Sequence, residues 1–148
     1  MHIYATIAIP GTVITVDRLA AELEVRLAPY GDAAEDTRGG KWESWVLGGR
    51  HHNAWTVNNS ARASARRLAE ELPSWRRPSD TTRLGCLARV HDIDPMSIMA
   101  TTVYIDLDGT WRDSRGRGPE EPRWADDYAA WIATLPADTW LALLDGHR

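Results

Sequence analysis

Proline and glycine divide this chain into short segments, and the segments alternate between two hydrophobic periodicities. Residues 2–9 alternate their side chains with a period of two and are rich in β-branched residues, which predicts a strand that Pro10-Gly11 ends. Residues 16–27 repeat apolar side chains every three or four positions, which predicts a helix that Asp17 caps. Segments of these lengths bury their apolar surface by packing helices against a sheet.

The same alternation continues to the end of the chain. Asp108-Gly109 is a hairpin-turn signal, and residues 112–123 are charged and rich in Pro and Gly, which predicts a loop. Residues 53–57 and 84–90 are either short strands or irregular segments. The remaining predicted elements are strands over 42–47, 101–107 and 139–144, and helices over 61–72, capped by Ser60, and 124–135.

This order predicts a single α+β domain over residues 1–148. We expect a mostly antiparallel sheet with helices packed on one face, and a ferredoxin-like arrangement is the leading topology. The chain contains 43% apolar and 26% charged residues, which is an ordinary composition for a globular domain of this length.

Composition also limits where the protein acts and what it binds. The single cysteine excludes an internal disulfide framework, and the chain has no apolar run of membrane-spanning length. The N-terminus lacks the basic and apolar stretches of a secretory signal, so we expect a cytoplasmic protein. The net charge of −4 disfavours non-specific binding to nucleic acid.

Motifs for covalent catalysis are weak or absent. The stretch from Asp106 to Thr110, DLDGT, is similar to the first motif of haloacid-dehalogenase-type phosphatases, but only 38 residues follow it and the later motifs are missing. The chain has neither a Gly-x-Ser-x-Gly elbow nor a Gly-x-x-x-x-Gly-Lys phosphate loop. Cys86 lies among apolar residues, which favours a buried thiol over a nucleophile. We therefore assign no catalytic residue.

Histidine and aspartate side chains offer one set of candidate metal ligands. These residues are His51, His52, His91, Asp92 and Asp94. Adjacent histidines rarely bind one ion from the same side, and no His-Glu-x-x-His or Cys-x-x-Cys spacing is present. We therefore expect histidines in surface loops, with neither a metal nor another cofactor.

Arginines gather in and after the second predicted helix, around Trp75. Arginine and an aromatic ring together can hold a phosphate and stack on a base. The simpler interpretation is a solvated helix face whose arginines pair with Glu70 and Glu71, and the acidic net charge favours it. The cluster consists of Arg62, Arg66, Arg67, Arg76 and Arg77.

Tryptophan is the most unusual residue type here, with eight copies and no phenylalanine in the chain. Trp124 and Trp131 share a helix face and are predicted to be core residues. Trp42 and Trp45 would point to opposite faces of one strand, so they cannot share one core, and one is expected to be exposed or under a loop. Tryptophan and arginine are also enriched at binding hot spots. The candidate residues for partner or ligand binding are Trp42, Trp45, Arg50, His51, His52 and Trp55.

Three stretches carry a resemblance to a known group of proteins. They are Lys41-Trp42-x-x-Trp45-x-x-Gly48-Gly49-Arg50, Asp108-Gly109-Thr110-Trp111 and the closing Asp145-Gly146-His147. In this order they resemble small uncharacterised proteins of actinobacteriophages and their hosts. His51-His52 departs from the pattern, which has a tryptophan near that position. The resemblance implies an origin and a compact α+β fold, and it implies no chemistry.

Two classes of function follow as hypotheses. The first is a non-enzymatic, phage-type accessory protein that binds and modulates a host protein, for example as an inhibitor of a bacterial defence system. The alternative is a small-ligand protein that captures or cleaves a nucleotide through the Trp, Arg and His residues named above. Direct binding of nucleic acid through the arginine cluster ranks below both. A homodimer is compatible with either hypothesis.

Overall fold

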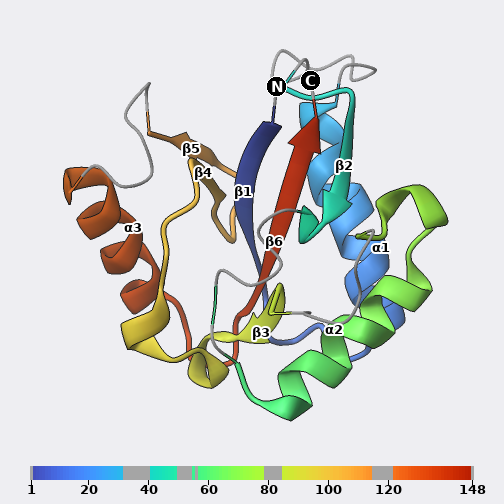
Figure 1. Ribbon diagram of the computed structural model, residues 1–148, viewed down its shortest axis with the longest axis horizontal. Coiled ribbons are helices and arrows are strands. Elements are labelled where there is room, and N and C mark those ends of the chain that lie inside the picture. The colour runs from blue at the N-terminus through green and yellow to red at the C-terminus, as the bar shows by residue number, and fades with distance from the viewer. Residues whose placement is uncertain are drawn as a thin grey trace.

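The computed structural model describes residues 2–31, 41–49, 55, 57–78, 85–114 and 122–147 (Figure 1). In these ranges the helices are α1 (Val16–Leu27), α2 (Asn59–Glu71) and α3 (Pro122–Thr134). The strands are β1 (His2–Ile9), β2 (Ser44–Leu47), β3 (Leu87–Arg89), β4 (Val103–Ile105), β5 (Trp111–Asp113) and β6 (Trp140–His147). Single 3₁₀ turns cover Ala28–Tyr30, Ser74–Arg76, Val90–Asp92 and Pro95–Ser97. None of the described helices is long and apolar enough to cross a membrane.

The strands form one sheet in the order β2-β6-β1-β4-β5, and β3 also pairs with β6. The first and last strands lie together at its centre, antiparallel from His2↔His147 to Ile9↔Trp140 (Figure 1). All other pairs are antiparallel except β1 with β4, which is parallel. The predicted α+β class with a mostly antiparallel sheet is therefore confirmed.

The detailed topology differs from a ferredoxin-like arrangement. In the split β-α-β unit of that fold, a further strand lies between the two parallel strands. Here β1 and β4 are parallel and directly hydrogen-bonded, with Ala5, Thr6 and Ile7 opposite residues 103–105. The β5 strand also occupies the beginning of a segment that was predicted to be a loop.

The helices are divided between the two faces of the sheet rather than gathered on one. Alternation places Thr6 and Tyr104 on one face, where the Thr6 Oγ1 atom lies 2.7 Å from the Tyr128 hydroxyl of α3. Ile7 and Trp140 point to the other face, where the Trp140 indole donates to the Val13 carbonyl just before α1. Figure 1 shows α3 on the opposite side of the sheet from α1 and α2.

Local signals account for most of the helix and turn positions, with two corrections at the helix starts. Asn58, rather than Ser60, caps α2, because its Oδ1 accepts the Ala61 backbone N–H at 2.8 Å. Asp17 lies inside the first turn of α1 rather than at its cap. The hairpin turn between β4 and β5 is confirmed, and Gly109 adopts a positive φ of 84° there.

Candidate functional site

The three tryptophans predicted to bind a partner or ligand are buried in the hydrophobic core. Trp42, Trp45 and Trp55 expose 1%, 3% and 2% of their surface. The interpretation that Trp42 and Trp45 cannot share one core is wrong, because β2 begins only at Ser44. Trp42 precedes this strand and forms an isolated bridge with Gly31, so the period-two alternation does not extend to it.

Packing explains why these rings are buried. A Cβ atom at Gly146 would lie 2.4 Å from the Trp42 ring, so the indole lies directly on the β6 backbone. The Arg76 guanidinium covers the Trp45 ring at 4.2 Å and also pairs with Glu24 of α1 at 3.1 Å. In this arrangement Trp42 and Trp45 have no face available for stacking on a ligand.

Two residues of the arginine cluster, Arg76 and Arg77, make contacts that hold neighbouring elements together. Besides its pairing with Glu24, Arg76 donates to the Trp45 carbonyl at 3.2 Å. Arg77 donates to the carbonyls of Glu70 and Leu72 at 3.0 Å, near the end of α2. Arg76 and Arg77 lie after the end of α2, and these contacts differ from the expected pairing of the arginines with the Glu70 and Glu71 side chains.

The other predicted binding residues, Arg50, His51 and His52, lie outside the residues that the structure describes. Gly49, the last described residue before them, has a φ of 52°, and a Cβ atom there would lie 2.2 Å from the Asp145 Cβ. The backbone therefore approaches β6 closely at this point.

A concave surface lies elsewhere, between α3 and the β4–β5 hairpin. It is a cleft of about 670 Å³, a size typical of ligand sites. Tyr104 stacks on Trp131 with ring centroids 4.0 Å apart and lies 5.7 Å from Trp124. The cleft is lined by Tyr104, Asp106, Trp111, Arg112, Asp113, Trp124, Asp127, Ala130, Trp131 and Thr134.

Three aspartates and one arginine line this cleft, and one of the aspartates, Asp113, accepts the Trp111 indole N–H at 3.3 Å. Asp106 Oδ1 accepts the Trp131 indole N–H at 3.1 Å and its neighbour's backbone N–H at 2.8 Å. Burial raises the pKa of the Tyr104 hydroxyl most, the Arg112 guanidinium lowers it, and the carboxylates of Asp106 and Asp127 each raise it by less. An acidic cleft with aromatic walls is suited to a cationic group.

Sequence reasoning missed this cleft. Its residues come from β4, β5 and α3, and the pattern of each element indicates its own buried face but not its neighbours. Trp111 was noted in the turn that carried the resemblance, and Trp124 and Trp131 were correctly predicted to be buried. The hairpin that brings Asp113 and Trp111 beside α3 could not be located from these local patterns.

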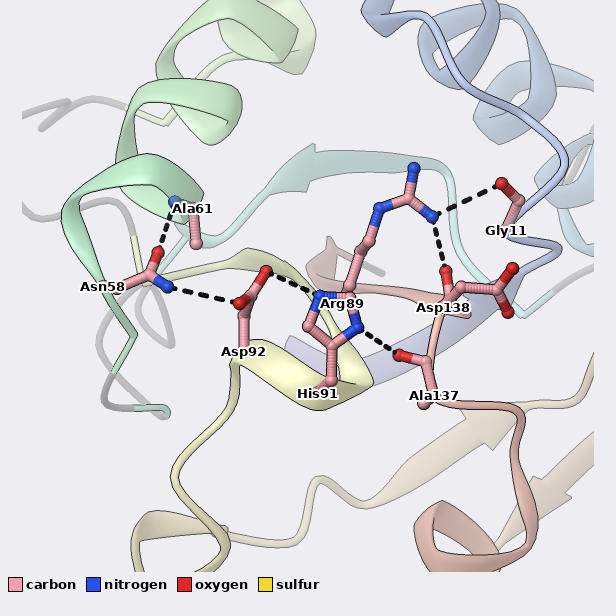
Figure 2. Close-up of polar contacts among 8 residues, drawn as sticks. All are labelled: Gly11, Asn58, Ala61, Arg89, His91, Asp92, Ala137 and Asp138. Atoms are coloured by element: carbon pink, nitrogen blue, oxygen red, sulfur yellow. Dashed lines mark hydrogen bonds and ion pairs between the residues drawn. The ribbon is translucent and has the colours of Figure 1, made fainter.

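A second polar cluster contains some of the predicted metal ligands (Figure 2). His91 Nδ1 donates to the Ala137 carbonyl at 2.8 Å, and its Nε2 lies 3.5 Å from Asp92 Oδ2. Asp92 Oδ1 accepts from Asn58 at 3.2 Å, and Arg89 donates to the Asp138 carbonyl at 2.7 Å. These bonds tie the segment after β3 to the starts of α2 and β6.

The described residues bear on two further kinds of chemistry, metal binding and thiol reactivity. Across the described ranges, no group of three or more His, Cys, Asp or Glu side chains is placed to hold a metal ion. Asp94 caps a 3₁₀ turn by accepting the Met96 backbone N–H at 3.0 Å. Burial raises the pKa of the Cys86 thiol to about 12, so this thiol stays protonated at neutral pH.

Comparisons of the chain with protein-family models, with curated proteins and with solved structures find no match.

Proposed function

We propose that this protein is a non-enzymatic binding protein whose cleft between α3 and the β4–β5 hairpin receives a lysine or arginine side chain of a partner protein. In line with the resemblance to actinobacteriophage proteins, the partner is a host protein and the chain is a phage-type accessory protein. Inhibition of a bacterial defence system is one example of such a role.

The observation that carries this proposal is the composition of the cleft wall. Asp106 and Asp127 lie near enough to raise the pKa of Tyr104, Asp113 lines the cleft and accepts the Trp111 indole N–H at 3.3 Å, and Arg112 is the one cation among the lining residues. A guanidinium or ammonium group would gain from the carboxylates and from the electron-rich faces of the rings. The net charge of −4 would also speed the approach of a basic partner.

The hydrogen bonds of Asp106 support binding rather than proton transfer. Its Oδ1 accepts two N–H groups, from the Trp131 indole and from the backbone of Leu107. These two donors fix the orientation of the Asp106 carboxyl group, which suits a group that recognises a partner. Fixed anions beside stacked rings provide recognition of a cation without a chemical step.

The nucleotide hypothesis receives less support from the geometry. Its three tryptophans are buried, and the cleft that is open carries three carboxylates, which would repel phosphate groups. Nucleotides therefore serve as a negative control in the test below.

The test uses two short peptides that differ only in charge, one with a central arginine and one with citrulline in its place. We expect the arginine peptide to shift the indole N–H resonances of Trp111 and Trp131, and the effect to weaken as salt is added. Replacing Asp127 by Asn is expected to weaken binding about tenfold, since a charge-assisted bond is lost.

Asp126→Asn provides a matched control for this experiment. It removes the same charge from the next residue of α3, but Asp126 does not line the cleft. The proposal fails if the arginine and citrulline peptides bind alike, if Asp126→Asn weakens binding as much as Asp127→Asn, or if ATP shifts the cleft resonances in place of the arginine peptide.

A further inference from the structure

The ends of the first and last strands bring two histidines together. His2 and His147 are direct partners in the antiparallel pairing of β1 with β6, so their side chains project from the same face of the sheet. Their ring centroids are 5.2 Å apart and the ring planes are almost perpendicular, at 83°. His2 is partly exposed and His147 is exposed, so solvent reaches both.

A buried carboxylate fixes one of these rings. The Asp145 side chain is only 6% exposed, and its Oδ1 lies 2.7 Å from His2 Nδ1. A carboxylate accepts a hydrogen bond, so His2 Nδ1 carries the proton and the lone pair is on Nε2. Gly49 packs so tightly on Asp145 that a Cβ atom there would overlap it, which further limits movement of the carboxylate.

This arrangement is the one that metal-binding histidines use. Their second ring nitrogen commonly donates to a carboxylate, which orients the ring and makes the metal-binding nitrogen more basic. A zinc ion lies about 2.0–2.1 Å from an imidazole nitrogen, which puts two ring centroids at a tetrahedral angle about 5.2 Å apart. The observed centroid separation of 5.2 Å agrees with that value.

We propose that His2 and His147 together bind a divalent transition-metal ion such as Zn²⁺, with Asp145 as the carboxylate that orients His2. The bound ion places positive charge beside the buried Asp145 carboxylate, which offsets the cost of burying that anion. With two protein ligands, the remaining positions hold water or exchangeable ligands, so the site is open rather than structural. This site is independent of the cleft and of its proposed ligand.

The experiment measures Zn²⁺ binding by calorimetry to chelator-treated protein that carries no histidine tag. We expect one ion per chain, and we expect His147→Ala and His2→Ala each to weaken binding at least about tenfold. Asp145→Asn is expected to weaken binding about 10–100-fold while both ligands remain. Because His147 is exposed, its replacement should leave the thermal unfolding of the metal-free protein unchanged.

His91→Ala is the matched control, because His91 is an exposed histidine near the opposite end of β6. A second control replaces His51 and His52, which lie outside the described residues. The Co²⁺-loaded protein adds a spectroscopic readout, since loss of a nitrogen ligand changes its visible absorption. Zn²⁺ affinity that is unchanged in the His2→Ala/His147→Ala double variant, or lost only in the controls, overturns the proposal.

Discussion

The two faces of the sheet are packed by different chemistry. On the α1 face, Ile7 and Ile105 meet a helix whose buried stripe is aliphatic, including Leu23. On the α3 face, the Thr6 Oγ1 atom lies 2.7 Å from the Tyr128 hydroxyl and 2.8 Å from the Thr101 Oγ1 atom, so the centre of the interface is polar.

This difference indicates which face is available for recognition. On the α1 face the aliphatic stripe is joined by Trp140, whose indole donates to the Val13 carbonyl at 2.8 Å, so the described contacts there serve packing. The α3 face combines rings with fixed hydrogen bonds, and at the hairpin end it opens into the acidic cleft. The position of the cleft at the edge of the polar interface suggests that one set of aromatic side chains serves both packing and binding.

The largest effect is expected from a cavity on the aliphatic face. Leu23→Ala removes a fully buried side chain from α1 and should lower the free energy of unfolding by about 3 kcal/mol. Urea unfolding measures the change, and Val25→Ala is the control, because Val25 is 70% exposed on the same helix and should cost less than about 0.5 kcal/mol. Equal costs for the two variants would contradict the assignment of the α1 face as the dry core.

The second effect, on the polar face, depends on pH. Burial raises the pKa of Tyr128 from 10.0 to about 12, against smaller lowering by its contacts with Thr6, Thr101 and Trp55. The Tyr128 hydroxyl ionises at a lower pH in the unfolded chain than in the folded chain. Its full contribution to the stability of the folded state is therefore present below about pH 10. It loses about 2–3 kcal/mol of stability as the pH rises to about 12.

Tyr128→Phe isolates this contribution. The variant cannot ionise at position 128, so its free energy of unfolding should fall less steeply than that of the wild type over the same alkaline range. The buried Cys86 thiol titrates in both proteins and cancels in the comparison. Parallel curves from urea unfolding at several alkaline pH values would show that the Tyr128 hydroxyl is not buried as described.

The sequence predicted the elements better than their arrangement. The stripe of α1, the rings of α3 and the turn at Gly109 follow from local spacing, and each lies where it was expected. The pairing of His2 with His147 joins residues at the two ends of the chain and has no local signal. The parallel pairing of β1 with β4 also has no local signal in the sequence, and it decides which face of the sheet each helix covers.

The candidate site shows the same limit. The prediction put Trp42 in the same strand as Trp45, which extended the period-two alternation two residues too far. As a result, one of two buried rings was expected at the surface. The carboxylates of Asp106 and Asp127 are separated by 20 residues of sequence and meet through the packing of α3 on β4. A spacing rule within one element cannot bring such groups together.

The smallest expected effects compare the buried centre of the α3 face with its open edge. The Trp124 indole donates to the buried Thr101 carbonyl at 2.7 Å, whereas the Trp131 indole donates to Asp106 at the cleft, at 3.1 Å. Replacing either ring by Phe removes one donor and a similar amount of apolar surface. Trp124→Phe leaves the carbonyl without this donor and should cost about 1–2 kcal/mol.

Trp131→Phe should cost less than about 1 kcal/mol, because water in the cleft can replace the lost donor to the partly exposed Asp106. Urea unfolding of both variants gives the two values, and the arginine peptide provides a second readout. If Trp131→Phe destabilised the protein as much as Trp124→Phe, water would not reach Asp106, and a carboxylate closed to water would also be closed to the guanidinium of a partner.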